Sequence, residues 1–209
     1  MTNDVSQAHY RFARRRIREA RAELASGEGV FAFPVVVDLL TDAVYHRHVA
    51  RSHRRPPVVF LDFDGVLNGK DTREAPSPFH KGLFLNPECV ERANRICERA
   101  GAVVVLTTSW RARTDETGCR VDVRAALRDA GFRGRVIGAT PAFADWPTTF
   151  TPRRNEIQRW LAEYGARAYV VLDDHDDASI FGQFVRCDTR VGLTDADVEA
   201  AIGILRGGQ

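Results

Sequence analysis

Pairs of aspartates follow two apolar runs of the chain, and they are the residues best suited to chemistry. Asp62 and Asp64 come after a run of Val, Val, Phe and Leu, and Asp173 and Asp174 come after a run that ends in Val, Val and Leu. If the fold brings these acids together, a cation or shared protons must compensate their buried charge. Oxygen ligands without histidine or cysteine favour Mg²⁺, particularly where a substrate supplies phosphate oxygens. The two pairs therefore predict a magnesium site.

Apolar runs alternate with helical stretches from Pro57 onward, which is typical of an α/β domain with a mostly parallel sheet. Runs without polar residues are expected for strands that are buried on both faces. We therefore predict a Rossmann-like three-layer sandwich in residues 57–209. Its expected strands are Val58–Leu61, Val103–Leu106, Arg135–Ile137, Ala168–Leu172 and Phe184–Cys187, of which the first, second and fourth are central.

Capping residues mark the helices between these strands. Asn86 followed by Pro87 favours a helix start, and Gly101 favours its end. The other expected helices run from Thr151 and Pro152 to Gly165, over Val121–Ala130, and from Thr194 to about Leu205.

Three of the predicted strands deliver polar residues to one edge of the sheet. In open parallel sheets the ligand site lies beyond the carboxyl ends of the strands. Thr107 and Thr108 follow the strand Val103–Leu106 and so join the two aspartate pairs at that edge. A helix cap or a loop residue would explain any one of these acids, but not the acids and hydroxyls of three strands together.

Residues 1–56 differ from the rest of the chain in charge. They hold ten Arg and six acidic residues, a formal charge of +4, whereas the whole chain has +2. The stretch from Arg11 to Leu24 combines helix-forming composition with an apolar stripe, so we predict an N-terminal extension with an amphipathic helix. Its arginines bind nucleic-acid phosphates or form a solvated helical face, and the sequence leaves both open.

The overall composition excludes several classes of protein. With 44% hydrophobic and 28% charged residues, a chain of 209 residues is expected to fold as one globular domain with an appendage. No apolar run approaches the roughly 20 residues of a membrane span, and the first residues lack the pattern of a secretory signal. We therefore expect a cytoplasmic protein that does not enter a membrane.

The segment from Val58 to Leu67, with Asp-x-Asp-Gly between apolar residues, resembles the first signature of the haloacid dehalogenase (HAD) superfamily of phosphatases. Thr107 or Thr108 resembles the second signature, a basic residue that opens a helix the third, and Asp173-Asp174 the fourth.

Four further segments resemble, more narrowly, the HAD-type domain of Swiss Army Knife RNA-repair proteins. The likeness covers about residues 57–205, and nothing before Pro56 contributes to it. The segments are Leu106–Arg111, Val136–Pro141, Glu156–Leu161 and Gly192–Asp195.

The resemblance implies a role for each residue of the site. Asp62 would attack phosphorus and form a phosphoaspartate, while Asp64 would give a proton to the leaving oxygen and later take one from water. Thr107 would hydrogen-bond the phosphoryl group, and Arg153 or Arg154 would neutralise its charge.

Metal and substrate contacts follow from the same resemblance. Mg²⁺ would be bound by Asp62, by the backbone carbonyl of Asp64 and by Asp174, with Asp173 close by. Gly65, Thr108 and Trp110 are the expected substrate-binding residues. The aromatic side chains able to stack on a base are Trp110, Phe143, Trp146 and Phe150, although core packing is their commoner fate.

The segments 68–100 and 112–151 leave too little chain for a large cap domain, so we predict a minimal cap and an open site. An open site admits large substrates. The predicted activity is that of a Mg²⁺-dependent phosphomonoesterase acting on a phosphorylated small molecule, such as a nucleotide, or on a nucleic-acid end. Two alternatives are a HAD-like binding module whose Arg-rich segment binds a partner, and a phosphotransferase to an acceptor other than water.

Overall fold

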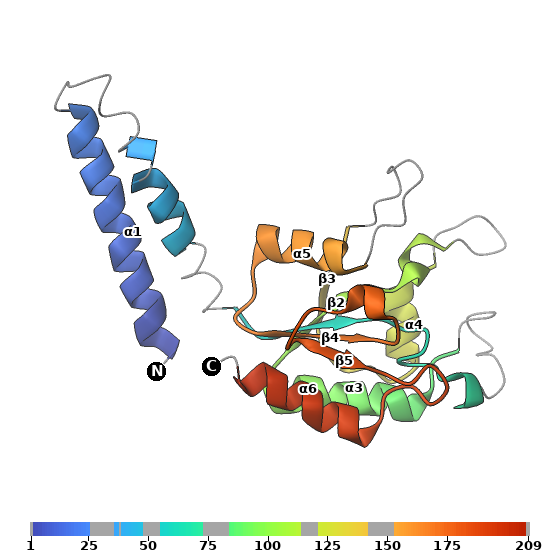
Figure 1. The fold of residues 1–209 in the computed structure, drawn as a ribbon. Coiled ribbons are helices and arrows are strands. Elements are labelled where there is room, and N and C mark those ends of the chain that lie inside the picture. The colour runs from blue at the N-terminus through green and yellow to red at the C-terminus, as the bar shows by residue number, and fades with distance from the viewer. Residues whose placement is uncertain are drawn as a thin grey trace. The chain divides into compact units, whose positions relative to one another are not determined.

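The structure, a computed structural model, describes residues 2–25, 36–37, 39–47, 55–72, 84–113, 121–141 and 153–207 (Figure 1). The chain divides into two compact units. One comprises Met1–Arg55 with Tyr164–Arg167, and the other comprises Pro56–Glu163 with Ala168–Gln209.

The described part of the second unit contains a five-stranded sheet in the order β3-β2-β1-β4-β5. Neighbouring strands all pair in parallel, which confirms the predicted α/β class. The three inner strands are the three that were predicted to be central, and nearly all of their residues are buried because helices cover both faces. The strands are β1 (Val58–Leu61), β2 (Val103–Leu106), β3 (Val136–Ala139), β4 (Tyr169–Asp173) and β5 (Phe184–Arg186).

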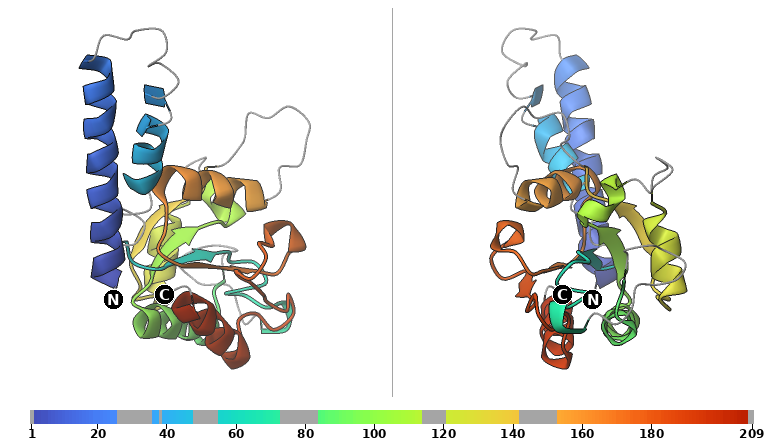
Figure 2. Two further views of the ribbon diagram at one scale, coloured as in Figure 1. Left: turned by 60° about the vertical axis from the view of Figure 1, so that its left-hand side comes forward. Right: turned by 90° about the vertical axis from the view of Figure 1, so that its right-hand side faces the viewer.

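Helices form the two outer layers of this sandwich (Figures 1 and 2). Residues of α3 (Pro87–Ala100), α4 (Val123–Asp129) and α6 (Asp195–Gly207) share one buried apolar cluster with Leu61 and Leu172 of the sheet. On the opposite face, Trp160 of α5 (Arg153–Tyr164) packs edge-on against Phe60 with ring centroids 5.4 Å apart. This arrangement confirms the predicted three-layer fold.

The caps of α3 act as the sequence predicts. The side chain of Asn86 accepts a hydrogen bond from the Glu88 backbone N–H, and Pro87 opens the helix. Gly101 ends it in the left-handed conformation, with φ of 60°. At the start of α5, the predicted caps Thr151 and Pro152 lie outside the described residues.

The described residues between the first three strands contain little besides α3 and α4. They add the short 3-10 helices η1 (Lys70–Thr72) and η2 (Ser109–Ala112). Residues 73–83, 114–120 and 142–152, which complete the two segments where a cap would be inserted, lie outside the described part of the chain.

The first unit is a pair of helices. The predicted amphipathic helix is part of α1 (Thr2–Ala25), and residues 36–37 and 39–47 are also helical. Ala13 and Ala20 of α1 are buried, and a guanidinium nitrogen of Arg16 lies 2.9 Å from a carboxylate oxygen of Asp42 on the second helix. Leu24, expected on the apolar stripe, is exposed. No helix in the described residues is long and apolar enough to span a membrane.

Candidate active site

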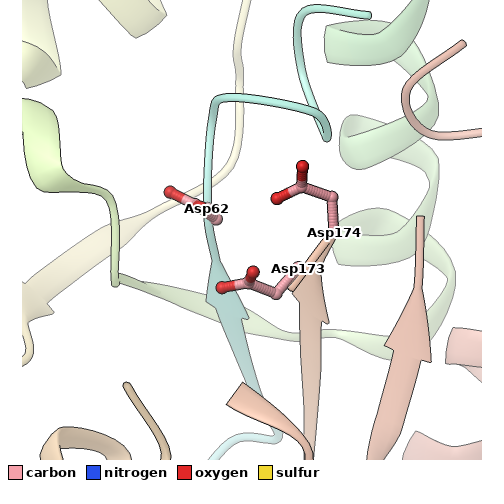
Figure 3. Close-up of side chains that lie close together, drawn as sticks. All are labelled: Asp62, Asp173 and Asp174. Carbon is pink, nitrogen blue, oxygen red and sulfur yellow. The ribbon is translucent and has the colours of Figure 1, made fainter. Parts of the chain in front are cut away.

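Three aspartates meet at the carboxyl edge of the sheet because β1 and β4 are neighbours in register. Leu61 pairs with Leu172, so Asp62 and Asp173 leave the sheet side by side, and the Asp62 backbone N–H donates to the Leu172 carbonyl at 3.1 Å. Asp62, Asp173 and Asp174 each offer a carboxylate oxygen within 4.8 Å of the others (Figure 3). The sequence analysis therefore predicted the correct edge of the sheet for these three aspartates.

These three carboxylates are almost completely buried, with exposed fractions of 4%, 0% and 6%. Burial raises the pKa of Asp62, while the positive charge of Arg153 opposes the shift. Burial also raises the pKa of Asp173 to about 7, with the nearby negative charge of Asp62 adding to the increase. The cluster is costly in its ionised form unless further positive charge is present.

Two oxygens of the cluster fit a metal ion. Asp173 Oδ2 and Asp174 Oδ1 are buried and accept no hydrogen bond from the described residues. Unsatisfied buried carboxylate oxygens are rare in folded proteins, and a bound cation is one explanation for them. Three carboxylates with no nitrogen or sulfur ligand form the donor set of a hard ion such as Mg²⁺.

Arg153, at the first turn of α5, is the positive charge nearest to the cluster. Its Nη1 lies 3.0 Å from Asp62 Oδ1 and donates to the Thr107 carbonyl at 2.6 Å. Its Nε lies 3.6 Å from Asp173 Oδ2. Arg154, the other predicted candidate, is exposed. Of the two arginines, the structure thus brings Arg153 to the aspartates.

The start of α5 is held beside the site by a second ion pair. Arg111 donates to Glu156 at 2.6 Å, and the Thr140 hydroxyl donates to the same carboxylate at 3.0 Å. Arg111 also donates to the Thr107 and Thr108 carbonyls. Glu156 and Arg111 were not predicted as site residues, because no local pattern relates two residues 45 positions apart.

Thr107 and Thr108 differ in what their hydroxyls do. Both are fully buried, but Thr107 Oγ1 has no hydrogen-bond partner among the described residues. Thr108 Oγ1 accepts from the Trp110 backbone N–H at 3.3 Å and so caps η2. The Thr108 hydroxyl therefore has a capping contact, whereas the Thr107 hydroxyl has no contact in the described residues; the substrate-binding role of Thr108 stays a prediction.

The Asp64 side chain lies apart from the three clustered aspartates. Trp110 Nε1 donates to Asp64 Oδ2 at 2.6 Å, and Asn68 Nδ2 donates to Asp64 Oδ1 at 2.9 Å. Arg113 Nη2 also lies 3.5 Å from Asp64 Oδ2. Both oxygens of this carboxylate therefore have fixed donors, and Asn68 is a site residue that the sequence analysis missed.

Trp110 itself is in the core. Its side chain is 1% exposed and packs edge-on against Phe63, with ring centroids 5.3 Å apart. A buried ring in this position cannot stack on a base, so the predicted stacking role of Trp110 is not supported. The other candidate stacking residues, Phe143, Trp146 and Phe150, lie outside the described residues.

Gly65 is required where β1 turns into the site. Its φ is 74°, and a Cβ at this position would lie 2.3 Å from Asp174 Oδ2. Asp174 is held there by Thr189, whose hydroxyl donates to the same oxygen at 2.9 Å. Gly65 thus makes room for a carboxylate of the cluster.

Replacing Gly65 with alanine is expected to reduce the free energy of unfolding by about 2 to 4 kcal/mol, because the left-handed backbone and the contact with Asp174 both become strained. Chemical denaturation would measure the loss. Gly101→Ala is the control, since Gly101 has φ of 60° but no atom within 4 Å of its Cβ position. Equal losses of unfolding free energy in the two variants would show that the contact with Asp174 contributes nothing to the destabilisation.

The parallel sheet, with aspartates after β1 and β4, a threonine after β2 and an arginine opening α5, defines a Rossmann-like α/β protein with a HAD-type site. Residues 58–198 match the family model described as the HAD domain in Swiss Army Knife RNA repair proteins, and the chain belongs to this family. Comparison with curated proteins and with solved structures gave no match.

Proposed function

We propose that the protein is a Mg²⁺-dependent phosphomonoester hydrolase that works through a phosphoaspartate on Asp62. The observation that carries this proposal is the convergence of Asp62, Asp173, Asp174 and Arg153 at one edge of the sheet. Arg153 also contacts the Thr107 carbonyl, and the buried Thr107 hydroxyl has no hydrogen-bond partner among the described residues. Membership of a HAD family supports the same chemistry.

Asp62 is the proposed nucleophile. One of its oxygens bonds to phosphorus while the bond from phosphorus to the leaving oxygen breaks, and water then displaces Asp62 and releases inorganic phosphate. Arg153 contacts Asp62 Oδ1 and the Thr107 carbonyl, so its guanidinium lies where the charge of a transferring phosphoryl group needs compensation. The unpartnered Thr107 hydroxyl is the proposed hydrogen-bond donor to the same group.

Asp62, Asp173 and Asp174 are the proposed protein ligands of Mg²⁺. When bound, the ion would offset the charges of these carboxylates and of the substrate phosphate. Asp173 Oδ2 and Asp174 Oδ1, which accept no hydrogen bond from the described residues, support this assignment most directly.

Asp64 is the proposed general acid and base, and Trp110 and Asn68 position it. These two residues donate hydrogen bonds to the two oxygens of the Asp64 carboxylate and so fix its direction. General acid and base catalysis depends on a carboxyl group held within reach of the proton that it transfers.

Replacing Trp110 with phenylalanine is expected to lower kcat about 10-fold with little change in KM, because a hydrogen bond to a charged group contributes about 1.5 kcal/mol or more. Phenylalanine keeps a ring against Phe63 but removes the Nε1 donor. Steady-state kinetics would separate kcat from KM. Trp160→Phe, the same change on the other face of the sheet, is the control. Equal effects of the two changes would mean that Trp110 contributes packing alone.

The proposed substrate is a nucleotide or a phosphorylated nucleic-acid end. The family description, which names RNA repair, supports this choice, as does the short chain available for a cap. The test is phosphate release from a panel of phosphomonoesters that includes 3′- and 5′-phosphorylated RNA, with Mg²⁺ and with EDTA. Release that requires Mg²⁺ and is fastest on RNA ends would support the proposal. A wild-type protein as inert as Asp62→Asn on every substrate would favour the interaction module instead.

A further inference from the structure

One exposed face of α1 carries four arginines at helical spacing. Arg11, Arg14, Arg18 and Arg21 follow one another at intervals of three, four and three residues, so they share one side of the helix. All four are exposed. We call these four residues the basic face of α1. At 1.5 Å per residue it extends over about 15 Å.

The basic face lies opposite the side of α1 that packs. Ala13 and Ala20 on the packed side are buried. Two other arginines of α1 have acidic partners: Arg16 contacts Glu19 and Asp42, and Arg15 contacts Glu19 at 2.7 Å. Glu19 and Asp42 are thus paired with arginines outside the basic face.

Three members of the basic face carry no compensating charge. Within the described residues, Arg14, Arg18 and Arg21 form no ion pair with a carboxylate. Like charges three or four residues apart destabilise a helix, and ordinary solvated helices alternate the sign of their surface charges. Three neighbouring arginines without an acidic partner in the described residues therefore indicate a polyanionic ligand that supplies the missing negative charge.

The chemistry of the face favours a phosphodiester backbone over a lipid surface. A helix that binds membranes needs a wide apolar face beside its basic one, but Ala13 and Ala20 of α1 are buried and Phe12 and Ile17 are only partly exposed. Regularly spaced guanidinium groups suit a chain of phosphates, whose neutralisation releases counterions.

We infer that the basic face of α1 binds the phosphodiester backbone of single-stranded RNA. The choice of RNA among polyanions rests on the proposed function. α1 lies outside the matched residues 58–198. An RNA-binding helix in the same chain would raise the local concentration of RNA ends for the phosphatase site.

The test uses the full-length protein and a fluorescently labelled single-stranded RNA without a terminal phosphate, with binding followed by anisotropy over a range of salt concentrations. The variant Arg14→Gln/Arg18→Gln removes two charges four residues apart. Arg124→Gln/Arg128→Gln on α4 is the matched control, since this pair is also exposed and four residues apart. The variant Arg14→Lys/Arg18→Lys retains the charge, and circular dichroism verifies the helix in each protein.

The loss of two phosphate contacts is expected to raise Kd roughly 10- to 30-fold at 0.1 M salt and to reduce the slope of log K against log salt by about 1.4. The control and the lysine variant should bind within about 3-fold of wild type. Unchanged binding by Arg14→Gln/Arg18→Gln would overturn the inference. So would equal competition by polyglutamate, because the face would then recognise acidic protein.

Hydrolysis of p-nitrophenyl phosphate separates this inference from the proposed function. Arg14→Gln/Arg18→Gln should hydrolyse this small ester at the wild-type rate, since none of the site residues is changed. If no variant hydrolyses any phosphomonoester but RNA binding still depends on Arg14 and Arg18, the proposed function fails and the RNA-binding face stands.

Discussion

Asp62→Asn is expected to reduce kcat for phosphomonoester hydrolysis by about 10⁴-fold or more, the scale observed when a catalytic nucleophile is removed. The amide that replaces the carboxylate cannot form the phosphoenzyme. Its volume is nearly the same, so the buried edge of the sheet is retained. The measurement is phosphate release under saturating substrate with Mg²⁺.

The control for Asp62→Asn is Asp195→Asn. Asp195 lies at the start of α6, is exposed and contacts Arg95, so its replacement tests the same chemical change away from the site. Activity within about 2-fold of wild type is expected for it. A residual kcat above about a tenth of wild type in Asp62→Asn would contradict the nucleophile assignment, because general electrostatic stabilisation would then suffice.

Much of the fold could be predicted because the strongest local patterns agree with the tertiary structure. The central strands are buried on both faces, which makes Val103–Leu106 a continuous apolar run. β3 was harder to place because it is an edge strand whose residues alternate between half-buried and exposed. Its alternation is typical of a strand with one covered face. The apolar run in this segment is short, so the sequence predicted the end of the strand only approximately.

The parts of the site that could not be predicted depend on direction and distance in space. Arg153 and Arg154 are adjacent, so their side chains leave α5 about 100° apart, and only the packing of the helix decides which one meets Asp62. The contact between Trp110 and Asp64 joins residues 46 positions apart. The sequence shows an aromatic residue after β2 but not that its indole turns inward.

Sequence order did predict which acids meet, because parallel strands place their carboxyl ends at one edge. It could not predict that Asp64 would be separated from the other three aspartates. Its carboxylate is instead hydrogen-bonded by Asn68 and Trp110 and is not one of the three that cluster. The result is two carboxylate environments within a short segment, a buried one for Asp62 and a partly exposed one for Asp64.

Without metal, the protein is expected to lose stability as the pH rises from about 4 to about 7. The pKa of Asp173 is about 7 in the folded protein against an ordinary value of 3.8, so between these values the folded state holds a proton that the unfolded state has released. The free energy of unfolding then falls by up to about 1.4 kcal/mol per pH unit and levels off above the folded pKa. Urea denaturation in EDTA at several pH values measures this slope.

Asp173→Asn isolates the contribution of this carboxyl group, since both proteins keep the same six histidines. In the variant, the free energy of unfolding should no longer fall with pH by the amount that Asp173 contributes. The variant should therefore be more stable than wild type at pH 8 in EDTA. Parallel pH profiles of the two proteins would show that Asp173 does not titrate in this range.

Addition of Mg²⁺ should reverse the loss of stability that occurs at high pH without metal. A metal binds the ionised carboxylates, so the rise in melting temperature on adding millimolar Mg²⁺ should be larger at pH 8 than at pH 5. Asp174→Asn removes one proposed ligand and should abolish most of that rise, whereas Asp195→Asn should keep it. A Mg²⁺ effect equal in all three proteins would indicate binding elsewhere on the surface. Because the ionised Asp173 is stabilised only when a cation is bound, the proposed metal site lowers the stability of the metal-free protein.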